Sequence, residues 1–218
     1  MPSACRRVEP QGKPSFDLRE ADASTRPQLE RFIARRFAEV YDARLHSFMP
    51  RLFGLYCTDG QLHAAFGLRA ASAQPLFLER YLDAPIEAYV AERSDAPASR
   101  RRIVEVGNLA GATPGAVREL IVLLSDRLFD EGFHWVAFTG SAGLCNSFSR
   151  MGLPLSVIAS APVERLRPEE RQYWGRYYDK SPSVMLGDVA GGRRQLHSSS
   201  GHGDSVDVFA LLNGVGAP

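Results

Sequence analysis

Apolar residues recur along this chain with two spacings, one typical of helices and one typical of strands. A period of 3.6 residues predicts long helices from Thr25 to Tyr41 and from Pro114 to Gly132. Alternating or β-branched runs predict strands at residues 16–19, 52–57, 62–70, 103–106, 135–139 and 155–159. From residue 103 onwards strands and helices alternate, which favours parallel neighbouring strands joined by crossover helices.

Turn and capping residues indicate where these elements end. Asp59-Gly60 is a strong hairpin signal between the second and third strands. Thr25 and Gln28 have the spacing of a capping box, and Gly132 takes the C-terminal glycine position of the second long helix. Ser141 is expected to cap a further helix that turns Leu144, Phe148 and Met151 inward, and a short helix is expected over residues 85–93.

The pattern divides the chain into three parts. Residues 1–15 are polar and read as a flexible leader, and residues 16–189 read as one α/β (α+β) domain. Residues 190–218 are rich in Gly and Ser and are expected to form a flexible tail.

Composition narrows the function classes. The chain has 218 residues, 44% hydrophobic and 23% charged, with a net charge of +1, so we expect no nucleic-acid partner. No apolar run approaches the ~20 residues of a transmembrane helix, and no secretory signal opens the chain. The three cysteines are scattered and odd in number, which indicates a reducing compartment and predicts a cytoplasmic protein.

Residues 103–117, IVEVGNLAGATPGAV, carry the strongest local signal. A strand is interrupted by Gly107, which marks a bulge or a close backbone approach. A small-residue loop, Ala110-Gly111-Ala112, then leads to a helix start with Thr113 as N-cap and Pro114 at the first position. Free backbone N–H groups and the helix dipole make this arrangement a natural anion site.

An extra residue at Gly107 would bring Glu105 and Asn108 to the same face of the strand. A carboxylate and an amide beside an interruption in the hydrogen bonding between two strands resemble a simple catalytic site. The other interpretation is a structural Glu105 paired with one of the arginines at 100–102. Taken alone, the stretch favours this second interpretation.

Other candidate chemistry is discounted. No metal site is predicted, because no cysteine or acidic cluster with ligand spacing surrounds His197 and His202. Ser199, His202 and Asp204 lie in the expected tail, whereas a catalytic triad needs a rigid frame. No nucleophile elbow, P-loop or dinucleotide fingerprint occurs in the chain.

Five blocks, in order, resemble the bacterial thermostable hemolysin family between about Phe32 and about Val184. They are YDARLHSFMPRL (41–52), AAFGLRAA (64–71), PLFLERYLDAPIE (75–87), RIVEVGNLA (102–110) and WGRYY (174–178). Members of this family look like divergent relatives of the Gcn5-related N-acyltransferase (GNAT) fold and are similar to acyl-homoserine-lactone synthases. The resemblance implies a GNAT-like mixed central sheet with helices on both faces and a bulged central strand.

The resemblance also implies a thioester co-substrate, acyl-CoA or acyl carrier protein. Its pantetheine arm would lie in a split beside the bulged strand, and its phosphates would lie on the loop before the long helix. The implied cofactor-binding residues are Val106, Gly107, Leu109, Ala110, Gly111, Thr113, Gly115 and Ala116.

Two positions depart from the usual pattern of this fold. Only Gly115 matches the phosphate-loop signature, and Phe148 stands where a tyrosine normally protonates the leaving thiolate. The implied roles are therefore Glu105 as base, Asn108 as positioning group, and Ser147 or Cys145 as proton donor, although interior packing better suits Cys145.

The function that these observations favour is N-acyl transfer from acyl-CoA or acyl carrier protein to a small amine or amino-acid acceptor. A second hypothesis is a non-catalytic binding module of the same fold, which the two departures support. A third is a membrane-active hemolysin, although no amphipathic helix with a basic face is visible.

Overall fold

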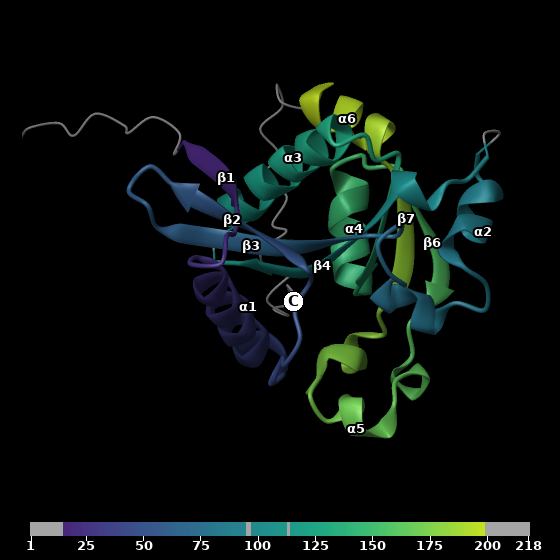
Figure 1. The fold of residues 1–218 in the computed structure, drawn as a ribbon, viewed down its shortest axis with the longest axis horizontal. Helices are drawn as coiled ribbons and strands as arrows, with labels where there is room; N and C mark the ends of the chain where they lie inside the picture. Colours follow the sequence, from purple (N-terminus) through teal and green to yellow (C-terminus); the bar gives the residue numbers. More distant parts are fainter. Residues whose placement is uncertain (1–14, 95–96, 113, 199–218) are drawn as a thin grey trace, which may run out of the picture.

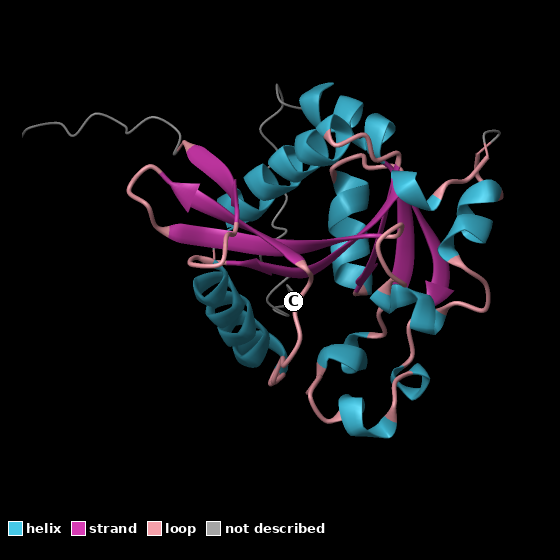
Figure 2. Ribbon diagram, in the orientation of Figure 1, coloured by secondary structure: helices cyan, strands magenta, loops and turns pink. Residues whose placement is uncertain are grey.

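One central sheet separates two helical layers (Figures 1 and 2). The computed structural model describes residues 15–94, 97–112 and 114–198. The strands are β1 (Phe16–Glu20), β2 (Arg51–Cys57), β3 (Leu62–Ala70), β4 (Ile103–Gly111), β5 (Trp135–Gly140), β6 (Leu155–Ser160) and β7 (Ser183–Asp188). The helices are α1 (Arg26–Tyr41), α2 (Ile86–Ala91), α3 (Pro114–Asp130), α4 (Ala142–Arg150), α5 (Pro168–Arg171) and α6 (Val189–Ser198). Short 3-10 helices are η1 (Phe77–Tyr81), η2 (Arg100–Arg102), η3 (Val163–Arg165) and η4 (Tyr177–Lys180).

The two long helices bury the apolar stripes that the sequence predicts. Helix α1 covers one face of the sheet, and α3, beside α6, covers the other (Figure 1). The buried residues of α1 are Leu29, Phe32, Ile33 and Phe37. The buried apolar residues of α3 include Val117, Leu120, Ile121, Leu124 and Leu128. Each such side chain contributes about 1.5–3 kcal/mol of hydrophobic stabilisation.

Local turn chemistry forms the first half of the sheet. Strands β2 and β3 make the predicted antiparallel hairpin, and Gly60 adopts a φ of 82° at its turn. The predicted strand at residues 16–19 is β1, which pairs antiparallel with β2.

The predicted capping box at the start of α1 is wrong, because the Thr25 side chain makes no capping hydrogen bond. Asp22 organises this turn instead. Its carboxylate accepts hydrogen bonds from the Ser24 hydroxyl at 2.7 Å and from the Thr25 backbone N–H at 2.9 Å. The Ser24 hydroxyl, together with Thr25, lowers the pKa of Asp22 to about 2.

The strand order departs from a simple parallel alternation. It runs β1-β2-β3-β4-β5-β7-β6, so β7 lies between β5 and β6 and is antiparallel to both. Only β4 and β5 form the expected parallel pair among the described strands. The sequence pattern missed β7 because its partners lie far away in the chain.

The tail expected from residue 190 is partly helical, which corrects that boundary for residues 190–198. The Asp188 carboxylate accepts a hydrogen bond from the Gly191 backbone N–H at 2.7 Å and thereby satisfies a donor in the first turn of α6. Leu196 is buried, and Arg193 and His197 both contact Asp126 of α3, at 2.6 and 2.8 Å. These contacts order a segment whose composition suggests flexibility.

Candidate functional site

The sheet opens between β4 and β5. These strands are paired in parallel from Ile103 opposite Trp135 to Val106 opposite Phe138. Beyond that point β4 continues to Gly111 without a partner on this side, while β5 pairs only with β7. The split therefore lies beside Asn108, where the sequence analysis expects it.

A bulge in β4 accompanies the split. Gly67 lies opposite Gly107 and Ala65 opposite Ala110, so Asn108 and Leu109 together face one residue of β3. Asn108 has a φ of 53°, a left-handed conformation that asparagine tolerates better than most residues. The extra residue is therefore not Gly107, and β4 includes Ala110 and Gly111, which were expected in a loop.

Gly107 is needed for a close approach, the other expectation for this residue. A Cβ atom here would collide with the methyl carbon of Met49. The Met49 backbone N–H donates to Asn108 Oδ1 at 2.8 Å, which holds the loop after α1 against the bulge. Glu105 and Asn108 both line one cavity, although the register of the bulge differs from the prediction.

This central cavity has a volume of about 130 Å³. It lies between the bulge, the loop after α1, η1, the start of α4 and the segment before β7. Aromatic residues from three separated segments form much of its wall: Phe37, Tyr41, Phe77, Tyr81, Trp174 and Tyr177. Arg69 of β3 brings a positive charge to the same wall.

Glu105 is the buried carboxyl group of this cavity, with 3% of its surface exposed. Its two oxygens accept hydrogen bonds from the backbone N–H groups of Phe77 at 2.8 Å and Leu78 at 3.0 Å. Burial raises the pKa of Glu105 to about 7, and these hydrogen bonds and the charge of Arg69 partly oppose that rise. A carboxyl group with this pKa can exchange a proton at neutral pH.

The alternative pairing of Glu105 with an arginine of η2 does not occur. Arg100 binds Glu79 and Glu87 instead, both at 2.6 Å.

Tyr177 is a candidate proton donor that was named from the sequence only within the block WGRYY (174–178). Its hydroxyl donates to the Thr139 carbonyl at 3.3 Å, near the open end of β5, and its ring lines the central cavity. Burial raises the pKa of Tyr177, so the hydroxyl keeps its proton at neutral pH. The only sequence signal is the repeated tyrosine in WGRYY.

The structure does not bring Ser147 to Glu105 and Asn108. Ser147 is fully buried in α4, and its hydroxyl accepts a hydrogen bond from Arg150 at 3.5 Å. Cys145 Sγ lies 3.0 Å from Met185 Sδ, and burial raises the pKa of the thiol. Neither side chain lines the central cavity.

The expected phosphate-binding residues lie at the far end of β4. The Ala112 backbone N–H donates to the His63 carbonyl at 2.8 Å, and the Gly111 carbonyl accepts from Arg36 Nε at 2.9 Å. Thr113 lies outside the described residues. Gly115 belongs to the first turn of α3, and Ala116 is buried in the core. Arg36 thus brings a guanidinium group to this end of the site, which the sequence analysis did not anticipate.

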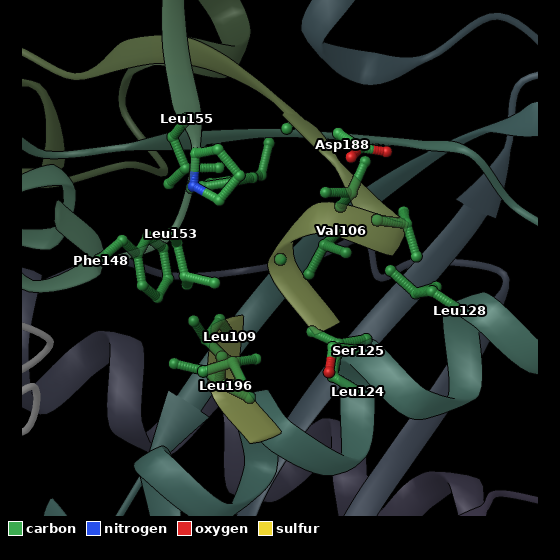
Figure 3. A pocket seen from close by; sticks show the side chains of 17 residues that line it. Val106, Leu109, Leu124, Ser125, Leu128, Phe148, Leu153, Leu155, Asp188 and Leu196 are labelled. Atoms are coloured by element: carbon green, nitrogen blue, oxygen red, sulfur yellow. The ribbon is translucent and has the colours of Figure 1, made fainter. Parts of the chain in front are cut away.

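A second, apolar cavity of about 90 Å³ lies between the sheet and helices α3, α4 and α6 (Figure 3). Leu109, Phe148, Leu153, Leu155 and Leu196 are among its walls (Figure 3). It shares Val106, Leu109 and Phe138 with the central cavity, so these residues form a common wall between the two cavities where β4 and β5 separate. The sequence analysis missed it because α6 forms one side.

The described residues contain one group of three side chains with metal-ligating atoms close together. Cys57, Asp59 and His63 at the β2–β3 turn bring such atoms within 4.8 Å of one another. None of the three lines either cavity. No helix in the described part of the chain has the length and apolar character needed to cross a bilayer.

Three solved structures with the same fold are described as synthases. The acyl-homoserine-lactone (AHL) synthase LasI is 13% identical, with a TM-score of 0.57 over 85% of this chain and 96% of LasI. FeeM, an N-acyl amino acid synthase from uncultured soil microbes, is 15% identical, with a TM-score of 0.56 over 84% of this chain and 95% of FeeM. MesI, a CoA-dependent acyl-homoserine lactone synthase, is 14% identical, with a TM-score of 0.53 over 87% of this chain and 98% of MesI.

These similarities establish the GNAT-like α/β fold and, at such low identity, the fold alone. No curated protein sequence matches the chain. A sequence model described as thermostable hemolysin matches residues 19–193, a longer span than the five blocks alone indicated. The chain therefore belongs to the thermostable hemolysin family.

Proposed function

We propose that this protein is a GNAT-like N-acyltransferase. It would move an acyl group from a thioester of CoA or acyl carrier protein to a small amine or amino-acid acceptor. The observation that carries the proposal is the buried carboxyl group of Glu105, with a pKa of about 7, in a cavity where β4 and β5 separate.

The donor would enter through the split. A pantetheine arm has amide groups, and the unpaired edge of β4 from Gly107 to Ala110 offers backbone partners for them. Phosphate groups would lie towards Gly111 and the start of α3, where Arg36 adds positive charge. The description of MesI as CoA-dependent supports a CoA-type donor.

The acyl chain would extend into the apolar cavity of Figure 3. This cavity adjoins the split through Val106, Leu109 and Phe138, and its walls are almost entirely hydrocarbon. Each buried methylene contributes about 0.8 kcal/mol, so a chain longer than acetyl would bind more tightly.

The reaction follows from the groups around the split. The acceptor nitrogen, as the neutral amine, attacks the thioester carbonyl carbon and forms the new C–N bond, while Glu105 accepts a proton from that nitrogen. A backbone N–H near the bulge stabilises the oxyanion, and Asn108 orients the acceptor. The C–S bond then breaks, and Tyr177 replaces Ser147 as the expected donor of a proton to the thiolate because it lines the cavity.

Release of free thiol from acyl-CoA in the presence of an amine panel tests the proposal. We expect Glu105→Gln to lower turnover by about 10²- to 10⁴-fold, the usual contribution of a positioned base. Glu92→Gln is the matched control, because Glu92 is exposed and lies outside both cavities. If Glu105→Gln turns over as fast as the wild type, Glu105 has no part in the reaction.

A non-catalytic binding module of the same fold is the second candidate, favoured by Phe148 at the usual tyrosine position and by the burial of Ser147. Binding of acyl-CoA without thiol release, across the whole amine panel, would support it. The cytoplasmic location stays a prediction from the sequence.

A further inference from the structure

Arg69 has an unusual environment for an arginine in a cavity wall. It lies on β3 directly opposite Glu105 of β4, and both residues line the central cavity. Its Nη1 reaches the Pro75 carbonyl at 3.4 Å, a long contact. Its Nε is buried and has no hydrogen-bond partner, the only such side-chain nitrogen or oxygen in the described part of the chain.

A buried donor without a partner is destabilising, by about 1–3 kcal/mol and more when the group is charged. Arginine cannot relieve this cost by losing its proton, because its guanidinium group stays charged in proteins. Other arginines of the described chain satisfy their Nε with carboxylates, as Arg26 does with Glu30 and Arg51 with Glu20. Arg69 therefore lines the cavity with a side chain whose hydrogen-bonding capacity the described residues do not satisfy.

Glu105 lies opposite Arg69 but is not its hydrogen-bond partner. The described donors to the Glu105 carboxyl group are the backbone N–H groups of Phe77 and Leu78. The cavity thus holds a cation and a carboxyl group on adjacent strands, and no hydrogen bond joins the two among the described contacts. A ligand with an amine and a carboxylate a few atoms apart would complement both groups.

We propose that Arg69 binds the carboxylate of the acceptor and that the acceptor is an α-amino acid. This inference rests on the proposed function and narrows its acceptor class. A guanidinium group can bind a carboxylate with two parallel hydrogen bonds. The amino group of the same molecule then lies towards Glu105, and its side chain meets the aromatic wall formed by Phe77, Trp174 and Tyr177.

The carboxylate takes no part in the chemistry. The amine forms the amide bond, the C–S bond breaks, one proton passes from nitrogen to Glu105, and the thiolate takes a proton. Arg69 holds the carboxylate throughout and is a binding residue that fixes the direction of the amine.

The test compares acceptors that differ only in the carboxylate. Thiol release from octanoyl-CoA is measured with phenylalanine, phenylalanine amide and phenethylamine, and with leucine and 3-methylbutylamine. We expect kcat/KM to be about ten- to a hundred-fold higher for each amino acid than for its decarboxylated amine. Arg69→Gln should remove this preference by lowering the rate with the amino acids more than the rate with the amines; the amine rate also falls, because the charge of Arg69 favours ionised Glu105.

Arg101→Gln is the matched control, because it removes the same charge from an exposed position outside the cavity. Arg69→Lys keeps the positive charge but lacks the planar guanidinium group with its paired N–H donors. This variant should therefore show only part of the preference for amino acids over amines. Equal rates with acid and amine in the wild type, or an equal loss for both in Arg69→Gln, would overturn the inference and leave the acyltransferase proposal standing.

A binding measurement separates the two proposals if no thiol is released. Calorimetric titration of the wild type with the same compounds, in the presence of CoA, is expected to detect the amino acids and not the amines. Arg69→Gln should abolish that difference. Absence of amino-acid binding would overturn the role of Arg69, whereas binding without turnover would overturn only the catalytic proposal.

Discussion

Two opposing effects act on the Glu105 side chain. Burial disfavours its charged form and raises the pKa to about 7, while the backbone N–H groups of Phe77 and Leu78 favour that form. The result is a carboxyl group that changes its protonation at neutral pH, unlike an exposed glutamate.

This protonation gives the activity a defined pH dependence. We expect kcat/KM to fall as the pH falls through about 7, because protonated Glu105 cannot accept a proton from the amine, and to level off above that pH. A pH–rate profile from about pH 5 to about pH 9 measures this. Any residual activity of Glu105→Gln should lack that inflection, and a wild-type profile without an inflection near neutrality would contradict the assigned role.

Strands β3 and β4 carry two glycines that both face Met49, and the two differ in what a side chain would meet. A Cβ at Gly67 would collide with Cβ of Met49, which lies next to the backbone, whereas a Cβ at Gly107 would collide with its terminal methyl carbon. The terminal methyl carbon of Met49 can move by a rotation within the side chain. Its Cβ atom can move only if the backbone of the loop after α1 moves with it.

We therefore expect Gly67→Ala to cost about 1–3 kcal/mol of unfolding free energy and Gly107→Ala to cost less. Gly107→Ala should instead reduce turnover, because the displaced Met49 side chain lines the central cavity. Urea unfolding and thiol release measure the two effects. Combining Gly107→Ala with Met49→Ala should relieve the collision. Equal stability losses in the two single variants would contradict this account.

Helices and turns that a local sequence pattern specifies could be predicted from the sequence. Pairing and contacts between residues far apart in the chain could not. The stripes of α1 and α3 and the Asp59-Gly60 turn specify their own structure. The bulge could be predicted approximately, but its register depends on pairing with β3 and on the Met49 contact.

At the scale of the whole molecule, the residues of the candidate site could also be predicted only where they lie close together in the sequence. Glu105 and Asn108 are close in sequence and were both predicted. Arg69 and Tyr177 reach the cavity only because β3 pairs with β4 and because the segment before β7 folds over the split. Helix α6 closes the apolar cavity from the end of the described chain, in a stretch whose composition predicts flexibility.

The apolar cavity should set the preferred acyl length. A Cβ at Gly192 would lie 3.5 Å from Leu153, an ordinary contact, so a larger side chain can project into the cavity. We expect Gly192→Leu to lower kcat/KM for dodecanoyl-CoA by about tenfold or more while changing that for butanoyl-CoA little. Gly192→Ala is the control for the backbone change, and a uniform effect on both donors would indicate that the chain lies elsewhere.

The position of β7 has a consequence for biosynthesis. This strand leaves the ribosome after β5 and β6, yet it is inserted between them and hydrogen-bonds to both. Until it emerges, β6 has no neighbour in the sheet, and the split beside Asn108 has only one completed wall. A nascent chain that stops before Ser183 therefore lacks the strand that joins β6 to β5 and the rest of the sheet.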